Sequence, residues 1–242
     1  MLEIRAVGPD SMEVIRAYDA VYAQAPLEHS PSFYLEMFDH LEARPGQRFL
    51  DVACGSGQLV ALAERRGLLA VGLDISRRAV GLGRGSLSLK RLVLGAGEAL
   101  PFKGESFDLV AVIGSLEHFW DPALGVREVH RVLRPGGKAV VLVPNTFSLT
   151  HVLYVWRKGE VFDDGQPLQR YATRRQWQRL IEAGGLIVLK VKRYERERPR
   201  RLRDWLGYLR RPGRLLRWLL GGLMPLDAVN CFVFICGRPE EP

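Results

Sequence analysis

The sequence has few cysteines and no long apolar run. Cys54, Cys231 and Cys236 are the three cysteines among 242 residues, an odd set without metal-ligand spacing. We therefore expect no disulfide framework and a reducing, cytoplasmic setting. Residues 1–10 lack the apolar stretch of a signal peptide, and the uncharged segment 218–226 is far shorter than the roughly 20 residues that a membrane span needs.

Basic residues are unevenly distributed along the chain. The formal charge is +8, from 35 Lys and Arg against 27 Asp and Glu. Residues 190–217 hold twelve of the basic and three of the acidic residues, so the remainder carries 23 basic and 24 acidic groups. The positive charge therefore describes one segment rather than the whole surface.

Strand and helix patterns alternate between residues 45 and 145. Apolar strands are expected at 48–53, 68–73, 91–94, 107–113 and 138–143, and helices at 58–66, 77–82 and 122–133. Arg134-Pro-Gly-Gly137 predicts a turn. Because these strands lack polar alternation, both faces of the sheet should be covered, and the alternation predicts an open parallel sheet.

The pattern is looser outside this stretch. Two leading amphipathic helices are expected at 12–22 and 32–41, a later helix at 173–183, and two more strands at 186–191 and 229–236. A basic amphipathic insertion, about residues 195–226, separates those last two strands. We expect one domain over residues 1–242, with a helical lid (1–44), a cofactor-binding core (45–145) and a substrate side (146–242).

A glycine turn follows the strand at 48–53. Gly55 and Gly57 allow the backbone to approach a ligand beyond the carboxyl end of that strand, and leave amides at a helix N-terminus free to face it. A dinucleotide fold requires a third small residue, where this chain has Val60. A nicotinamide dehydrogenase is therefore disfavoured.

Two carboxylates flank this turn. Asp74 ends the second strand, where it could accept the hydroxyls of a ribose or, alternatively, cap the next helix, a role that Ser76 could fill instead. Asp51 lies inside the turn, where it would repel a pyrophosphate and attract an ammonium. The sign of the charge favours a cationic ligand, such as an amino acid conjugated to a nucleoside.

An ordered set of motifs extends this pattern. They are Asp51-Val-Ala-Cys-Gly-Ser-Gly57, Asp74, Gly95-Ala-Gly-Glu-Ala-Leu-Pro-Phe102, Ser106-Phe-Asp-Leu-Val110, Ser115-Leu-Glu-His118 and Leu133-Arg-Pro-Gly-Gly137. The set resembles class I S-adenosylmethionine (SAM)-dependent methyltransferases of the small-molecule group that includes quinone-biosynthesis enzymes. The resemblance covers residues 45–145 well and 171–191 loosely. It implies a Rossmann-like, doubly wound α/β fold: a mostly parallel seven-stranded sheet with helices on both faces and an antiparallel last strand.

The resemblance also implies binding roles for SAM and its product S-adenosylhomocysteine. The implied cofactor-binding residues are Asp51, Ala53, Cys54, Gly55 and Gly57 near the methionine end, Asp74 and Ile75 near the ribose, Gly97 and Glu98 beside the adenine, and Gly114 and Ser115 after the fourth strand. Two positions depart from the family: Ala53 replaces a glycine, and Ala96 replaces the acid expected two positions before Glu98. Glu98 is then either an adenine contact or a solvated loop carboxylate.

Methyl transfer needs alignment and exclusion of water, and a base only where the acceptor arrives protonated. His118 is the candidate catalytic base, or alternatively a histidine that shapes the pocket. Related quinone methyltransferases use a Glu-His pair and an upstream acid around a metal, but the position three before Glu117 is Gly114, so no metal is expected. Tyr18 and Tyr22 could form a lid over the cofactor or pack against the sheet. The acceptor pocket is expected from the leading helices, residues 144–146 and residues 150–170.

The function expected is methyl transfer from SAM to an O, N or C atom of a small, lipid- or glycan-linked acceptor. One helical face, flanked by arginines, is expected to carry Leu202, Trp205, Leu206 and Leu209. This arrangement is typical of an interfacial helix. Residues 200–224 could touch an anionic membrane, or their apolar face could cover the protein's own core. The alternatives are an RNA or protein methyltransferase and a SAM-binding protein without turnover. Nucleic acid is disfavoured because Gly114-Ser-Leu-Glu117 replaces the Asn/Asp-Pro-Pro-aromatic stretch of base methyltransferases.

Overall fold

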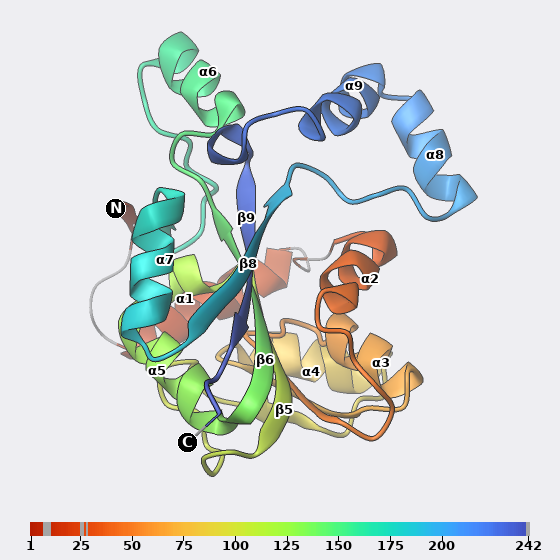
Figure 1. Ribbon diagram of the computed structural model, residues 1–242, viewed down its shortest axis with the longest axis vertical. Coiled ribbons are helices and arrows are strands. Elements are labelled where there is room, and N and C mark those ends of the chain that lie inside the picture. The colour runs from red at the N-terminus through yellow and green to blue at the C-terminus, as the bar shows by residue number, and fades with distance from the viewer. Residues whose placement is uncertain (7–10, 25–26, 28, 241–242) are drawn as a thin grey trace.

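A seven-stranded sheet organises the protein (Figure 1), for which a computed structural model describes residues 1–6, 11–24, 27 and 29–240. Its strand order is β4-β3-β2-β5-β6-β9-β8. In chain order the strands are β2 (Arg48–Val52), β3 (Leu69–Asp74), β4 (Leu92–Leu94), β5 (Phe107–Ile113), β6 (Leu133–Pro144), β8 (Ile187–Tyr194) and β9 (Cys231–Gly237). The last strand, β9, is antiparallel to β6 and β8, whereas β2 to β6 pair in parallel. The predicted fold class is confirmed.

Helices cover both faces of this sheet (Figure 1). On one side, α2 (Pro31–Asp39), α3 (Gln58–Arg65) and α4 (Arg77–Ser86) share a hydrophobic cluster with alternate strand residues such as Phe49. On the other, α5 (Pro122–Val132) and α7 (Arg174–Ala183) pack on the intervening residues such as Leu50. The central strands β2, β5 and β9 therefore bury both of their faces, which explains why their sequences show no polar alternation. The edge strand β8 is more exposed, with Ile187 and Leu189 open to solvent.

The strand order reverses between β2 and β5. From β2 the chain continues through β3 to the β4 edge, and β5 then starts the other half on the opposite side of β2. At such a switch point the connections diverge to the two faces and leave a crevice beyond the carboxyl ends of the strands. The turn after β2 lies at this position.

The chain folds differently from prediction in four places. The turn expected at 134–137 lies inside β6, where Gly136 adopts a φ of +72° and the pairing with β5 shifts register. The helix expected at 77–82 continues to Ser86, because Gly83 packs closely on the Ser56 backbone rather than breaking the helix. A two-stranded antiparallel sheet of β1 (Leu2–Arg5) and β7 (Leu168–Tyr171) was not expected, and neither was α6 (Leu149–Lys158).

The leading helix and the insertion lie at the periphery. Helix α1 (Ser11–Gln24) packs on α4, where Asp19 accepts hydrogen bonds from the Ser76 hydroxyl at 2.6 Å and the Arg78 amide at 3.1 Å. The insertion forms α8 (Leu202–Leu209) and α9 (Pro212–Gly221) between β8 and β9, as predicted. Short 3-10 helices at Leu116–His118 and Leu226–Ala228 complete the described elements.

Candidate functional site

A cavity of about 340 Å³ opens beyond the carboxyl ends of β3 and β5, beneath α1. Eight of the twelve candidate cofactor-binding and catalytic residues line it, and so do Tyr18 and Tyr22; the eight are Ala53, Asp74, Ile75, Gly97, Glu98, Gly114, Ser115 and His118. Asp51, Cys54, Gly55 and Gly57 are not among its lining residues. The residues assigned to the nucleoside thus meet at one cavity, whereas Ala53 alone of the five assigned to the methionine end lines it.

The packing of the turn after β2 explains why Gly55 and Gly57 do not line the cavity. Ala53, Gly55 and Gly57 have φ values of +56°, +56° and +83°, so Ala53 holds a left-handed conformation that suits the glycine it replaces. A Cβ on Gly55 would lie 2.6 Å from the Tyr22 hydroxyl, so the α1 side chain covers this turn. A Cβ on Gly57 would lie 2.5 Å from Leu89, which makes this glycine a packing requirement rather than a ligand contact.

Asp74 is held by the backbone around it. One carboxylate oxygen accepts the Gly55 amide at 2.7 Å, and the other accepts the Ser76 amide at 2.8 Å. The Ser76 hydroxyl caps α4 by accepting the Ala79 amide, so Asp74 is not the cap. Burial raises the pKa of Asp51 well above its usual value, and the nearby Asp74 charge adds to that rise. A cationic ligand would relieve this repulsion.

The segment after β4 passes close to an aromatic ring. A Cβ on Gly97 would overlap the Phe119 ring, so only glycine allows the two to pack at this distance. Glu98 accepts the Trp120 amide at 2.7 Å through one oxygen, and burial raises the pKa of its carboxyl group. Glu98 is therefore not the solvated loop carboxylate considered from the sequence. It ties this segment to the loop after β5.

The two ring nitrogens of His118 have different surroundings. Its Nδ1 lies 2.5 Å from the Leu168 carbonyl oxygen, so Nδ1 carries the proton and Nε2 keeps a lone pair. Burial lowers the pKa of His118 despite that contact, which keeps the imidazole neutral. Nε2 lies 3.9 Å from the Glu117 carboxyl group, whose burial raises its pKa to about 8. His118, beside Glu117, can therefore accept a proton at its Nε2 atom.

Arg170 of β7 positions the loop that carries His118. No sequence motif indicated this role. Its side chain is buried, pairs with Glu3 of β1 at 2.7 Å, and donates to the carbonyl groups of Phe119 and Trp120. Both strands are short and lie more than 160 residues apart, so local patterns could not predict this contact.

Three polar atoms at or beside the cavity are buried without a partner in the described part of the chain: Tyr18 Oη, Ser115 Oγ and Glu117 Oε2. Tyr18 and Ser115 line the cavity directly. Burial, helped by nearby carboxylates, raises the pKa of Tyr18. Because buried polar groups are normally hydrogen-bonded, these atoms indicate a polar ligand.

The remaining residues considered from the sequence differ in whether they reach the cavity. Asn145 donates to the carbonyl groups of Asp227 and Val229, and residues 144–146 do not line the cavity. Gln166 from the 150–170 segment does line it. Burial raises the pKa of the Cys54 thiol well above its ordinary value, which makes the thiol unreactive. Within the described ranges, no group of three or more His, Cys, Asp or Glu side chains could hold a metal ion.

Comparison with known proteins identifies the segment that builds this cavity. Residues 50–141 match the family model of a methyltransferase domain. This match covers less than half of the chain and includes the turn after β2, the segment after β4 and the loop after β5. The ubiquinone/menaquinone biosynthesis C-methyltransferase UbiE of Stenotrophomonas maltophilia (strain K279a) is 40% identical to the chain over 148 residues. That match covers 57% of this chain and 58% of that protein, so the chain spans little more than half the length of this relative.

Solved structures share the fold of this chain at low sequence identity. The [4+2]-cyclase SpnF superimposes with a TM-score of 0.66 at 17% identity, covering 98% of this chain and 100% of that one. A SAM-dependent methyltransferase from Mesorhizobium loti gives a TM-score of 0.64 at 17% identity, covering 86% of this chain and 99% of that one. Because one of these is named a cyclase, the shared fold does not by itself name the reaction.

Proposed function

We propose that the protein transfers a methyl group from SAM, held in the cavity beneath α1, to a small acceptor that reaches His118. One observation carries this proposal: four separate segments, at Asp74, Gly97–Glu98, Gly114–Ser115 and His118, converge on a single cavity. The buried acids and the unpartnered Tyr18 and Ser115 hydroxyls fit a cationic, hydroxyl-bearing nucleoside.

In this proposal Asp74 would hold the ribose, and the 97–98 segment would pass the adenine. Bound SAM supplies a methyl group on a positively charged sulfur. The chain contributes alignment, since Gly55 and Ser76 fix the Asp74 carboxylate, and exclusion of water, since Tyr22 covers the Gly55 turn. His118 would accept an acceptor proton at Nε2.

The acceptor that we propose is a lipid-linked ring of the quinone type. The name of the Stenotrophomonas relative includes ubiquinone and menaquinone biosynthesis and C-methylation. In this chain, Phe119, Trp120 and Leu124 provide an apolar wall of the cavity. An aromatic ring packs well on such a wall, and its hydroxyl could face His118.

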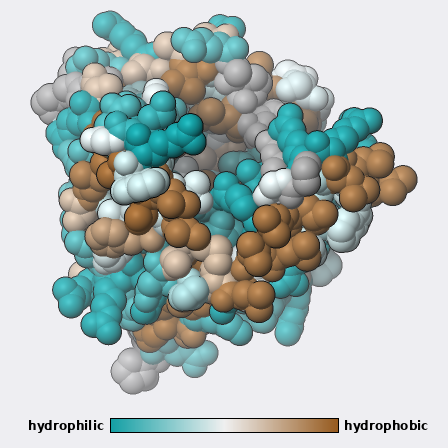
Figure 2. Space-filling model, turned by 90° about the horizontal axis from the view of Figure 1, so that it is seen from above, coloured by the Kyte–Doolittle hydropathy of each residue, from teal (hydrophilic) through white to brown (hydrophobic). Residues whose placement is uncertain are grey.

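We further propose that α8 and α9 rest on an anionic membrane. Their leucines do not cover the protein's core: Leu202 is 76% exposed, and Leu209, Leu216 and Leu219 are also exposed. In Figure 2, which looks down on this end of the molecule, brown apolar side chains gather beside teal ones on the right, where α8 and α9 lie. No helix in the described ranges is long and apolar enough to cross a membrane.

Calorimetry and a transfer assay test the proposed activity. We expect SAM to bind the intact protein saturably, NADH not to bind, and label from methyl-labelled SAM to appear on a short-chain demethylated quinol. Saturable NADH binding without SAM binding would overturn the proposal. Flotation with anionic vesicles tests the membrane contact separately, and absence of salt-sensitive retention would end it.

A further inference from the structure

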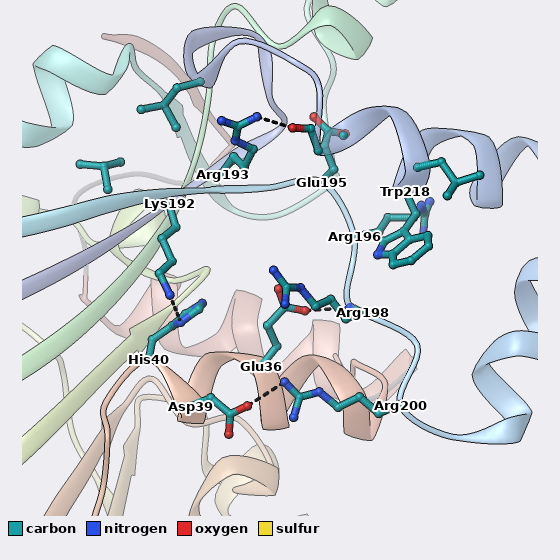
Figure 3. Close-up of a pocket in the computed structure, with 15 residues that line it drawn as sticks. Glu36, Asp39, His40, Lys192, Arg193, Glu195, Arg196, Arg198, Arg200 and Trp218 are labelled. Atoms are coloured by element: carbon teal, nitrogen blue, oxygen red, sulfur yellow. Dashed lines mark hydrogen bonds and ion pairs between the residues drawn. The ribbon is translucent and has the colours of Figure 1, made fainter.

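A second cavity, of about 870 Å³, lies between α2, the end of β8 and α9 (Figure 3). None of the residues that line the methyltransferase cavity also lines this one. Its cationic side chains are Lys192, Arg193, Arg196, Arg198 and Arg200, and its carboxylates are Glu36, Asp39 and Glu195. Five cations against three anions leave a surplus of two positive charges.

Two of the three carboxylates form ion pairs with arginines, and the third accepts a backbone amide. Asp39 pairs with Arg200 at 2.7 Å and with Arg66 at 3.4 Å. Glu195 accepts the Asn230 amide at 2.7 Å and pairs with Arg217 at 3.4 Å. The Glu36 carboxylate accepts the backbone amide of Arg198 at 2.8 Å, as Figure 3 shows.

Three of the cations contact neutral groups or none. Lys192 Nζ donates to His40 Nδ1 at 3.1 Å, and burial together with the Lys192 charge lowers the pKa of His40 to about 4, so this imidazole is neutral. Arg193 donates to the carbonyl oxygens of Gly222 and Met224. Arg196 Nε is buried with no partner among the described residues. No ion pair joins Lys192, Arg193 or Arg196 to a carboxylate in the part of the chain that the structure describes.

We propose that this cavity binds a phosphate monoester. Such a group carries about −1.5 to −2 charges and several acceptor oxygens, which match the surplus charge and the donors of Lys192, Arg193 and Arg196. Trp218, Leu219 and Leu226 line the same cavity, so an apolar substituent of the ester has a surface to contact. The site is separate from the methyltransferase cavity and does not depend on the function proposed for it.

Calorimetric titration of the intact protein with inorganic phosphate and with hexyl phosphate tests this site. We expect saturable binding of hexyl phosphate, weakened by about tenfold in each of Lys192→Gln and Arg196→Gln. Arg203→Gln is the matched control, since Arg203 is exposed on α8 and does not line the cavity. Circular dichroism shows whether each variant folds. If one of the two cavity variants does not fold, the other still tests the site.

The two probes distinguish the sources of the phosphate. Equal affinity for both would assign the site to a free phosphate group, whereas tighter hexyl phosphate binding that Trp218→Ala removes would assign it to an ester with an apolar tail. Absence of saturable binding of either probe up to about 10 mM would overturn the proposal. Equal weakening by the Arg203 variant would also overturn it, because the binding would then be nonspecific. SAM binding, measured in parallel, should be unchanged.

Discussion

The two cavities lie at the same edge of the sheet and carry opposite charge. Asp74, Glu98 and Asp121 line the first, and no Lys or Arg is among its described lining residues. The second is lined by five cationic side chains. The first cavity is built from segments that share motifs with known proteins, and the second depends on the insertion between β8 and β9. Charge sign therefore separates the ligands that each cavity would accept: a cationic nucleoside for the first, an anion for the second.

The largest effect is expected at His118, the basic group of the acidic cavity. His118→Ala should lower the rate of methyl transfer to a hydroxylated acceptor by about 10²–10⁴-fold and leave SAM affinity unchanged. Because burial lowers the pKa of His118 from its ordinary 6.5, the acidic fall in rate for the unmodified protein should lie below pH 6.5. Rate and pH profiles check both statements, and an unchanged rate would show that His118 only shapes the cavity.

A smaller effect is expected from removing the charge of Asp74. In Asp74→Asn one of the two amides that face the carboxylate loses its acceptor, so the turn and the proposed ribose contact should both weaken. SAM affinity should fall about 100-fold by calorimetry. Glu64→Gln, on an exposed position of α3, is the matched control and should bind SAM as before. Equal affinity in the two variants would remove Asp74 from the binding site.

Packing between the segment after β4 and the loop after β5 can be tested with two glycines. Gly97→Ala places a Cβ on the Phe119 ring and should destabilise the protein by about 1–3 kcal/mol. Gly81→Ala is the contrasting control, since nothing lies within 4 Å of its Cβ position in α4, and should stabilise the protein by about 0.5–1 kcal/mol. Chemical denaturation measures both, and a stable Gly97 variant would contradict the close packing.

The last prediction concerns pH and Glu117. Burial raises the pKa of Glu117 from 4.5 to about 8, so the folded protein retains a proton that the unfolded chain releases. The contribution of this group to stability is therefore present at low pH and falls as pH rises from about 4.5 to about 8. Glu117→Gln should flatten the decline of the melting temperature over this range. An identical pH dependence in the variant would show that other groups, such as Asp51, cause the decline.

The central sheet and the nucleoside side of the first cavity could be predicted because their signals are local. Uniformly apolar strands, the glycine turn at 55–57 and the Asp74 position each depend on a few consecutive residues. The insertion was also located correctly between the last two strands. The structure differs from the prediction at residues 134–137, which lie within β6 as an irregularity that the pairing with β5 skips, with Gly136 at a φ of +72°.

The sequence by itself determined the doubly wound fold, the similarity of residues 50–141 to a methyltransferase domain and the basic character of the insertion. Only the tertiary structure decided that Tyr22 covers Gly55, that Arg170 anchors the His118 loop, and that Lys192 and Arg196 lack carboxylate partners while neighbouring arginines have them. Hydrophobic periodicity reports how a segment buries its own face. Which charges are paired and which remain available for a ligand depends on contacts between distant segments, and these exist only once the chain has folded.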